Sequence, residues 1–397
     1  MTEVMAPHWR QHLPEVLAHV SGRAAAVDQA PQPDAGDPPQ PGEAGPRDSL
    51  NPGGGRPRDP LHPGGGRPRD PLHPGGGGPR ELLRHLGQRN LLSLDAAPGD
   101  TGVTEAAALI ELIAAECLSS AFSLWAHRMV IEYLRESGDP LGPVRAGLAA
   151  GTEVGSTAMA AALQELAGLR EVPVVATPDG GGYRLDGPIR WASNLVPGAT
   201  VVLPARVGDG AGRIVAVVRV GDPGVAVAPP QRLLALNATA SSSITLTGVH
   251  VEAGHVVTDD LAGFVRRARP VLLLLQTAFC LGLARRSLDE ARQLIRGEAT
   301  VLLPDLEESA ARLDDFAERA RRAQRAPADA DPLEITRLRY DAARLTLAAT
   351  RLEATASGGR GYATGTAVNR RLREAAFLPV QSPSETQLRW ELSQATT

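Results

Sequence analysis

The spacing of the apolar residues changes twice along this chain, and these two changes constrain its fold more than any other feature. Residues 104–136 carry apolar side chains at the spacing of one buried amphipathic helix, or of two. From residue 170 short apolar runs alternate with turn residues, and after residue 262 the helical spacing returns. We therefore expect an α+β protein with an N-terminal helical domain, a central β-barrel-like domain and a C-terminal four-helix bundle.

Turn residues place the elements of the last two blocks. The glycines at 180–182 could form a phosphate loop, but no helix follows to supply backbone amides, so a hairpin turn is favoured. The predicted strands are 172–176, 183–187, 200–207, 213–220 and 242–252. The predicted helices are 263–297, 305–326, 331–357 and 366–393, separated by prolines and a glycine pair.

A repeated unit marks the boundary of the first block. An 11-residue sequence recurs three times within 51–83, and its third copy ends in PRELL where the first two end in PRDPL. A proline in that slot stops a helix from starting, so we expect only the third copy to open a helix. The first two copies are expected to be a disordered spacer, with a proline-rich docking site as the alternative. The expected segments are a helix at 1–28, a Pro/Gly-rich spacer at 29–79, a helical domain at 80–150, a β domain at 151–260 and a helical bundle at 261–397.

The composition excludes several classes of protein. Hydrophobic residues make up 43% and charged residues 22% of the chain, as in an ordinary globular protein. The formal net charge of −4 argues against a dedicated nucleic-acid binder. Cys117 and Cys280 lie in apolar helical patterns and are expected to be buried, reduced thiols. Neither has histidines nearby at the spacing of a zinc site, so no metal is expected.

The most apolar run predicts a buried helix. Residues 271–284 fall short of the roughly 20 residues that span a bilayer. Residues 1–20 lack the uninterrupted apolar core of a secretory signal. We therefore expect a cytoplasmic protein that does not enter a membrane.

Three short segments carry residues suited to ligand binding, although each also has a purely structural interpretation. GTEVGSTA at 151–158 combines small residues with hydroxyls and a carboxylate. DGPIRWASN at 186–194 places Trp191 at a strand end, where it could bind a ligand or simply cap a barrel. The segment at 357–377 joins a glycine turn to an arginine-rich helix start, which could hold phosphates or only connect two helices.

Taken in order, these segments resemble the acyl-CoA dehydrogenase superfamily over residues 80–393. GTEVGS resembles the family's "TE…GS" loop, and YRLDGPIRWASN resembles its "dGy.lnG.K.WItN" strand pair. VHVEAGHVV resembles the strand that closes the family's β domain. ASGGRGY followed by RRLREA resembles its "GG.GY…R..RDa" segment. The resemblance implies a flavin-dependent oxidoreductase that binds FAD.

The resemblance also implies which residues bind the flavin. Thr152 and Ser156 would lie on the flavin ring and pyrophosphate. Trp191 would stack near the isoalloxazine, and Ser193 would form a hydrogen bond with N5. The glycine pair at 358–359, Gly358 and Gly359, would approach the FAD of a neighbouring subunit, which implies a homodimer or homotetramer.

The chain departs from the family at the catalytic base. When the sequences are aligned on Arg389, Ser382 stands in place of the glutamate that removes the substrate's α-proton. The serine hydroxyl is too weakly acidic to lose its own proton unaided, so it cannot act as the base without a second base that activates it. Glu385 lies about one helical turn further on and could be a displaced base. The first bundle helix offers no acidic residue in 269–282. The family's "R..FG" turn is also absent, which makes FMN or a loosely held reduced flavin an alternative to FAD.

Three functional hypotheses remain open. The first is a dehydrogenase that oxidises an acyl thioester, acyl-CoA or carrier-bound, and passes electrons to an electron-transfer partner. The second is a two-component monooxygenase of the same fold, which takes reduced flavin from a flavin reductase and oxidises a small molecule with dioxygen. The third is a non-catalytic partner subunit.

Overall fold

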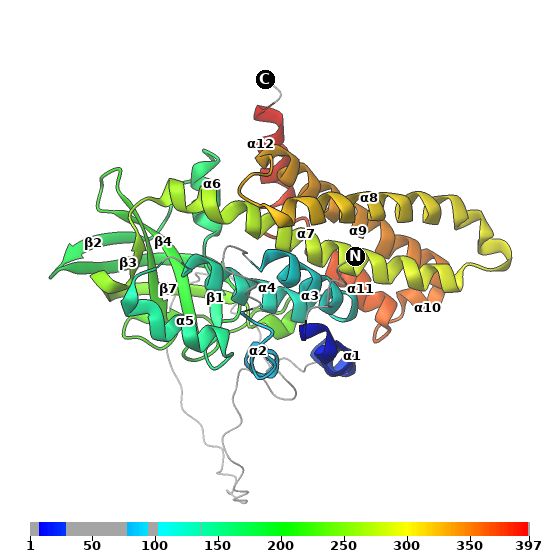
Figure 1. The fold of residues 1–397 in the computed structure, drawn as a ribbon, viewed down its shortest axis with the longest axis horizontal. Helices are drawn as coiled ribbons and strands as arrows, with labels where there is room; N and C mark the ends of the chain where they lie inside the picture. The colour runs from blue at the N-terminus through cyan, green and yellow to red at the C-terminus, as the bar shows by residue number, and fades with distance from the viewer. Residues whose placement is uncertain (1–7, 29–77, 94–101, 136, 396–397) are drawn as a thin grey trace, which may run out of the picture.

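The chain folds in the predicted order of helices, sheet and helices, which confirms the α+β architecture (Figure 1). This computed structural model describes residues 8–28, 78–93, 102–135 and 137–395. The spacer predicted at 29–79, with the first two copies of the repeat, lies outside the described residues except for its last two.

Six helices precede or flank the first strands. A 3₁₀ turn at His8–His12 leads into α1 (Leu13–Asp28), and α2 (Pro79–Gly87) begins with Pro79 at its first turn, as the third repeat copy predicts. The helical pattern at 104–136 is two helices, because Cys117 is extended (φ −159°, ψ 112°) between them. These are α3 (Val103–Glu116) and α4 (Leu118–Tyr133), followed by α5 (Gly142–Ala149) and α6 (Ala160–Leu166).

The sheet has eight strands in the order β6-β7-β3-β2-β4-β5-β8, with β1 paired to β4. Gly180 and Gly181 have positive φ in the turn between β2 and β3, which confirms the predicted hairpin. β2 begins later than predicted, since Pro173 has no N–H for the ladder. The bounds are β1 (Gly155–Thr157), β2 (Val175–Asp179), β3 (Gly182–Ala192), β4 (Thr200–Val207), β5 (Arg213–Arg219), β6 (Val225–Val227), β7 (Ser242–Glu252) and β8 (Val256–Thr258).

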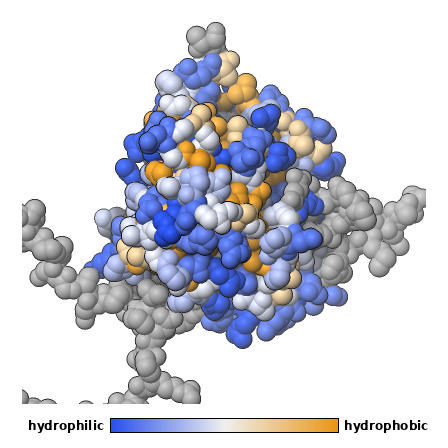
Figure 2. Space-filling view, turned by 90° about the vertical axis from the view of Figure 1, so that its left-hand side faces the viewer, coloured by the Kyte–Doolittle hydropathy of each residue, from blue (hydrophilic) through white to orange (hydrophobic). Residues whose placement is uncertain are grey.

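A glycine bulge interrupts the pairing of β3 with β7. The β3–β7 register shifts between Leu185 and Gly187, where φ is +134°. A Cβ at Gly187 would lie 2.8 Å from the carbonyl oxygen of Pro173, so no larger residue fits. Figure 2 views the sheet end of the molecule, where hydrophilic side chains cover most of the face and apolar ones form separate patches.

Three long helices follow the sheet, and they confirm the predicted positions closely. They are α7 (Leu261–Leu294), α8 (Leu303–Arg325) and α9 (Pro332–Ser357). The single helix predicted at 366–393 is wrong. It is two helices, α11 (Ala367–Ala375) and α12 (Glu385–Gln394), preceded by the short α10 (Gly359–Tyr362). Pro379 and Pro383 fall in the gap and break the helical pattern, which leaves Ser382 on a loop.

α7 is the central helix of the core. It is long and apolar enough by composition to cross a membrane, yet 89% of its most apolar window is buried inside the molecule. It packs between α3, α8 and α9, so helices from both ends of the chain share one core. Gly282 allows this, because a Cβ there would clash with the backbone carbonyl of Glu111 on α3. Cys117 and Cys280 are both buried here as free thiols, as expected.

His127 joins α4 to β1. Its Nε2 donates to the carbonyl of Leu148 (3.0 Å), and its Nδ1 accepts from the N–H of Gly155 (2.9 Å). The ring is therefore neutral, because a protonated Nδ1 would point its hydrogen at another N–H. Burial lowers the pKa of His127 to about 4.

The first prediction concerns the contact at Gly282. Gly282→Ala should lower the free energy of unfolding by about 1–3 kcal/mol, because the added methyl meets backbone that cannot move freely. Gly22→Ala is the matched control, since nothing lies within 4 Å of a Cβ at that helical glycine. It should be neutral or stabilise by up to about 1 kcal/mol. Urea unfolding measures both, and equal effects would contradict this packing.

The second prediction follows from His127. Its pKa is lower in the folded protein than in the unfolded chain, so its contribution is complete above about pH 6.5 and is lost as the pH falls towards 4. The loss should be roughly 3 kcal/mol. His127→Gln should remove this part of the pH dependence, whereas His250→Gln, at a half-exposed side chain, should keep it. The free energy of unfolding, measured with a denaturant from about pH 4 to pH 7, tests this. If its dependence on pH is unchanged in His127→Gln, the loss of stability does not come from His127.

Candidate functional site

A cavity of about 820 Å³ lies where the sheet meets the helices. α4, α6, α7, the end of β3, the loop before β7 and the 376–384 loop all contribute to its walls. Its inner wall is aromatic: Phe122 stacks on Trp125 with ring centroids 5.1 Å apart and meets Phe377 edge to face at 4.9 Å. These side chains suit a flat apolar ligand.

Trp191 and Ser193 lie together on the sheet side of this cavity. The indole of Trp191 is 49% exposed, which is unusual for a large apolar ring on a cavity wall. A planar aromatic ligand would cover it. Both positions were predicted from the sequence, and the structure brings them to one wall.

Ser193 is the first member of a chain of three hydroxyls. Thr239 Oγ1 donates to the carbonyl of Leu236 (2.8 Å), and Ser241 Oγ lies 2.6 Å from Thr239 Oγ1 and 2.7 Å from Ser193 Oγ. A hydroxyl has one hydrogen, and that of Thr239 is committed to the carbonyl. Ser241 must therefore donate to Thr239, and Ser193 must donate to Ser241. Ser193 is left presenting acceptor lone pairs to the cavity.

The backbone around these hydroxyls is strained. Asn194, Leu236 and Ala240 have positive φ (63°, 62° and 47°), a conformation that costs energy for residues other than glycine. The N–H of Asn194 donates to the carbonyl of Thr239 (2.7 Å), and its side-chain Nδ2 donates to the carbonyls of Ser123 (2.8 Å) and Gly155 (3.0 Å). Strain held in place this way is typical of ligand sites.

β1 supplies a second group of hydroxyls. Ser156 is buried, does not line the cavity, and its Oγ has no partner among the described residues. The next residue, Thr157, does line it, and its Oγ1 donates to the phenol oxygen of Tyr133 (3.4 Å). Burial raises the pKa of Tyr133, so this phenol stays protonated.

Ser382 also lines the cavity, from the 376–384 loop. Its Oγ has no hydrogen-bond partner among the described residues, while its carbonyl accepts from Gln276 Nε2 (2.9 Å) and Gln381 Nε2 (3.0 Å). The oxygens of both amides accept in turn from the buried Arg339, at 3.0 Å from Nε and 2.7 Å from Nη2. Arg339 and the two glutamines therefore hold the 376–384 loop in place at Ser382, and this part of the cavity wall is called its floor below.

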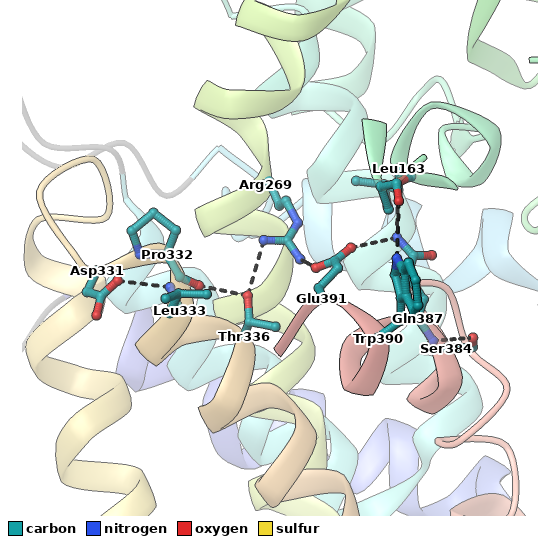
Figure 3. A network of polar contacts seen from close by, with 11 residues as sticks. Leu163, Arg269, Asp331, Pro332, Leu333, Thr336, Ser384, Gln387, Trp390 and Glu391 are labelled. Atoms are coloured by element: carbon teal, nitrogen blue, oxygen red, sulfur yellow. Dashed lines mark hydrogen bonds and ion pairs between the residues drawn. The ribbon is translucent and has the colours of Figure 1, made fainter. Parts of the chain in front are cut away.

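Glu385 does not line the cavity. It begins α12 and lies 3.8 Å from Arg389 one turn further on. Two polar contacts join α12 to its neighbours (Figure 3). Glu391 of α12 forms an ion pair with Arg269 of α7, and Gln387 Nε2 of α12 donates to the carbonyl of Leu163 on α6 (3.0 Å). The orientation of α12 is therefore fixed, and the Glu385 carboxylate is held near Arg389.

The other predicted positions also lie away from the cavity lining. Thr152 is exposed, and its hydroxyl donates to the carbonyl of Gly147 (3.1 Å). Gly358, with φ +59°, and Gly359 form an exposed turn with open space around them. Their expected contacts involve a ligand or a second subunit, so those roles stay predictions.

Sequence reasoning missed the polar residues that support the cavity walls. Gln276 is a lone amide in the apolar run of α7, and that was the available signal for a buried polar partner. Thr239 and Ser241 lie in a stretch of small residues with no recognisable motif. Arg339 has helical spacing that looks like any surface arginine, so nothing in the sequence marked it.

The charged side chains of the lining are mostly basic. Arg170, Arg190 and Arg373 contribute to it, and Glu171 is the one carboxylate among the lining residues. Glu171 is exposed on the loop before β2. A cavity with this lining favours a ligand with negative charge at its edges.

No known family model matches the sequence, and no curated protein matches it. Several solved structures, however, are similar to this chain. A glutaryl-coenzyme A dehydrogenase in complex with glutaryl-CoA is 16% identical with a TM-score of 0.77, covering 100% of this chain and 96% of that one. Glutaryl-CoA dehydrogenase from Mycobacterium smegmatis in complex with FADH2 is 17% identical with a TM-score of 0.70, covering 80% and 86%.

A dibenzothiophene monooxygenase from Paenibacillus sp. A11-2 is similar too, at 20% identity and a TM-score of 0.65, covering 81% of this chain and 90% of that one. At these identities the similarity concerns the fold. The same order of helices, sheet and helices recurs along nearly the full length of each neighbour. The chain therefore has the fold of the acyl-CoA dehydrogenase superfamily.

Proposed function

We propose that this chain is a flavin-dependent monooxygenase that binds reduced flavin against Trp191 and Ser193. The observation that carries the proposal is the lining of the cavity, in which Glu171 is the one carboxylate among the described residues and neither position considered for the base, 382 or 385, contributes another. The family resemblance puts Ser382 where the glutamate would stand, and Glu385 is held near Arg389 outside the lining. A monooxygenase needs no base to remove an α-proton, whereas a dehydrogenase does.

The residues on the sheet side fit a flavin. Trp191 offers an exposed indole face for a flat ring, and the hydroxyl chain leaves Ser193 as an acceptor. Reduced flavin carries a hydrogen at N5 and oxidised flavin does not, so an acceptor there favours the reduced form. When bound, reduced flavin would supply the electrons for dioxygen, so that one oxygen atom enters the substrate and the other leaves as water.

The protein's part in this reaction is to bind, orient and exclude water. Phe122, Trp125 and Phe377 form an apolar wall that would hold the substrate and keep water from the reacting atoms. A separate flavin reductase would supply the reduced cofactor. We propose FAD as the flavin, a cytoplasmic location and a homodimer or homotetramer, in which the exposed Gly358–Gly359 turn and Tyr362 would be covered.

A dehydrogenase acting on an acyl thioester is the second candidate. Two of the neighbouring structures are glutaryl-CoA dehydrogenases, and Glu171 does line the cavity. The arginines at the edge could hold the phosphates of such a substrate. In this case Glu171 or a repositioned Glu385 would have to act as the base.

The third prediction tests the chain of hydroxyls. Thr239→Val should remove the oxygen that accepts the hydrogen bond from Ser241. The Ser241 hydroxyl can then donate to Ser193 instead. The Ser193 hydroxyl is thereby free to donate its own hydrogen to oxidised flavin. The preference for reduced over oxidised FAD should fall about five-fold, the worth of one neutral hydrogen bond. Anaerobic titration of the purified chain with each form measures it.

Thr277→Val is the matched control, because that buried hydroxyl donates within α7 to Leu273 and does not line the cavity. It should leave the preference for reduced flavin unchanged. A preference that also stays unchanged in Thr239→Val would show that the chain of hydroxyls does not set it.

The fourth prediction separates the two candidate reactions. Acyl-CoA compounds of several chain lengths, added without oxygen, should not bleach the absorbance of the bound oxidised flavin, since the Ser382 hydroxyl cannot act as the base and Glu385 does not line the cavity. Supplied with reduced flavin, labelled dioxygen and a substrate, the chain should transfer one labelled oxygen atom. Bleaching by any acyl-CoA would overturn the monooxygenase, and Glu171→Gln and Glu385→Gln would then identify the base. A chain that binds neither FAD nor FMN would indicate a non-catalytic subunit.

A further inference from the structure

Arg339 is the largest fully buried side chain of the described residues, and it lies on α9 behind the Ser382 end of the cavity. Its Nε donates to Gln276 Oε1 (3.0 Å), and its Nη2 donates to Gln381 Oε1 (2.7 Å) and to the carbonyl of Leu378 (3.4 Å). Its Nη1 has no hydrogen-bond partner among the described residues. The guanidinium is thus only partly satisfied.

The charge of Arg339 also lacks a carboxylate partner among the described residues. Its neighbours are the two glutamine amides, the Leu378 carbonyl, the Cys280 thiol and the ring of Phe279, 5.9 Å away. Burial lowers the pKa of Arg339, yet an arginine remains protonated at neutral pH.

Two other buried arginines in the same half of the molecule show the ordinary arrangement. Arg371 forms an ion pair with Glu353, and Arg370 lies 3.2 Å from Glu374. A buried cation without an anion costs several kcal/mol. The position of Arg339 therefore calls for a negative charge from outside the described residues.

Two glutamine amides connect Arg339 to Ser382 in the cavity lining. Each glutamine accepts from Arg339 with its oxygen and donates to the Ser382 carbonyl with its nitrogen, so the arginine fixes which way both amides face. Gln381 and Ser382 line the cavity, and the Ser382 hydroxyl has no partner among the described residues. One hydrogen of the Gln381 amide also remains available, since its nitrogen carries two.

We propose that this end of the cavity is an anion subsite, so that the substrate is a flat apolar compound carrying one anionic oxygen. Ser382 and Gln381 donate to that oxygen, and the buried charge of Arg339 behind them stabilises it. The aromatic wall of Phe122 and Phe377 takes the apolar body. This inference deepens the proposed function and rests on it in taking the cavity as the substrate site.

The test compares two probes of nearly equal shape on the unmodified full chain. 4-Nitrophenol, at a pH where it is ionised, and the neutral 4-nitroanisole are titrated by calorimetry. The nitrophenolate should bind at least about ten-fold more tightly, the worth of a hydrogen bond to a charged group. Equal binding, or tighter binding of the anisole, would overturn the proposal and leave Arg339 as a clamp for the loop carbonyls.

Arg339→Met and Ser382→Ala then locate the effect. Arg339→Met should abolish the preference for the nitrophenolate while changing anisole binding less than about two-fold. Ser382→Ala should reduce the preference several-fold. Arg344→Met is the matched control, because Arg344 is exposed on the same helix and packs over Tyr340. If Arg339→Met does not fold, the two probes on the unmodified chain and Ser382→Ala still decide.

The outcomes for this subsite and for the proposed function are distinguishable. A chain that binds flavin but shows no preference for the nitrophenolate would refute the subsite and leave the flavin proposal standing. A chain that binds no flavin yet prefers the nitrophenolate would refute the monooxygenase and leave an anion-binding cavity. The flavin absorbance and the calorimetric titration report the two results independently.

Discussion

The burial of α7 on all sides over residues 271–284 is the constraint on which the rest of the structure depends. Gly282 lets α7 approach the backbone of α3, and α8 and α9 cover its other faces. Helices from the two ends of the chain thereby share one core. The same helix then extends to the cavity, where Leu272 lines the wall and Gln276 supports the floor. A shift of α7 would therefore disturb packing and ligand site together.

The unfavourable features of the molecule gather around that cavity. Three residues with positive φ hold the chain of hydroxyls on the sheet side, and Arg339, which has no carboxylate partner among the described residues, supports the Ser382 loop. The half-exposed indole of Trp191 lies on the wall beside Ser193. Each feature costs free energy in the isolated chain, and a bound flavin with an anionic substrate would offset all three.

The sequence predicts the architecture well, because long apolar patterns report directly on burial. It predicts the hairpin at Gly180 and the helix that begins at Pro79. Trp191, Ser193 and Ser382, named through the family resemblance, do line the cavity, while their roles stay predictions. Prediction from the sequence fails at 366–393, where two prolines outweigh the helical spacing on either side. It also fails at Ser241 and Arg339, since their contacts with Ser193, Gln276 and Gln381 join residues distant in sequence, and no local pattern records such contacts. Thr239 was missed because its stretch of small residues matches no motif.

The reduction potential of the flavin bound to the full chain tests the central claim most directly. A site that offers an acceptor from Ser193, with arginine charge nearby, binds reduced flavin more tightly than oxidised flavin. Linkage then raises the potential of the bound flavin above that of free flavin. Spectroscopic titration against reference dyes measures the difference. A bound potential above the free value is the predicted result, and a potential below it would contradict the account of the cavity as a site for reduced flavin.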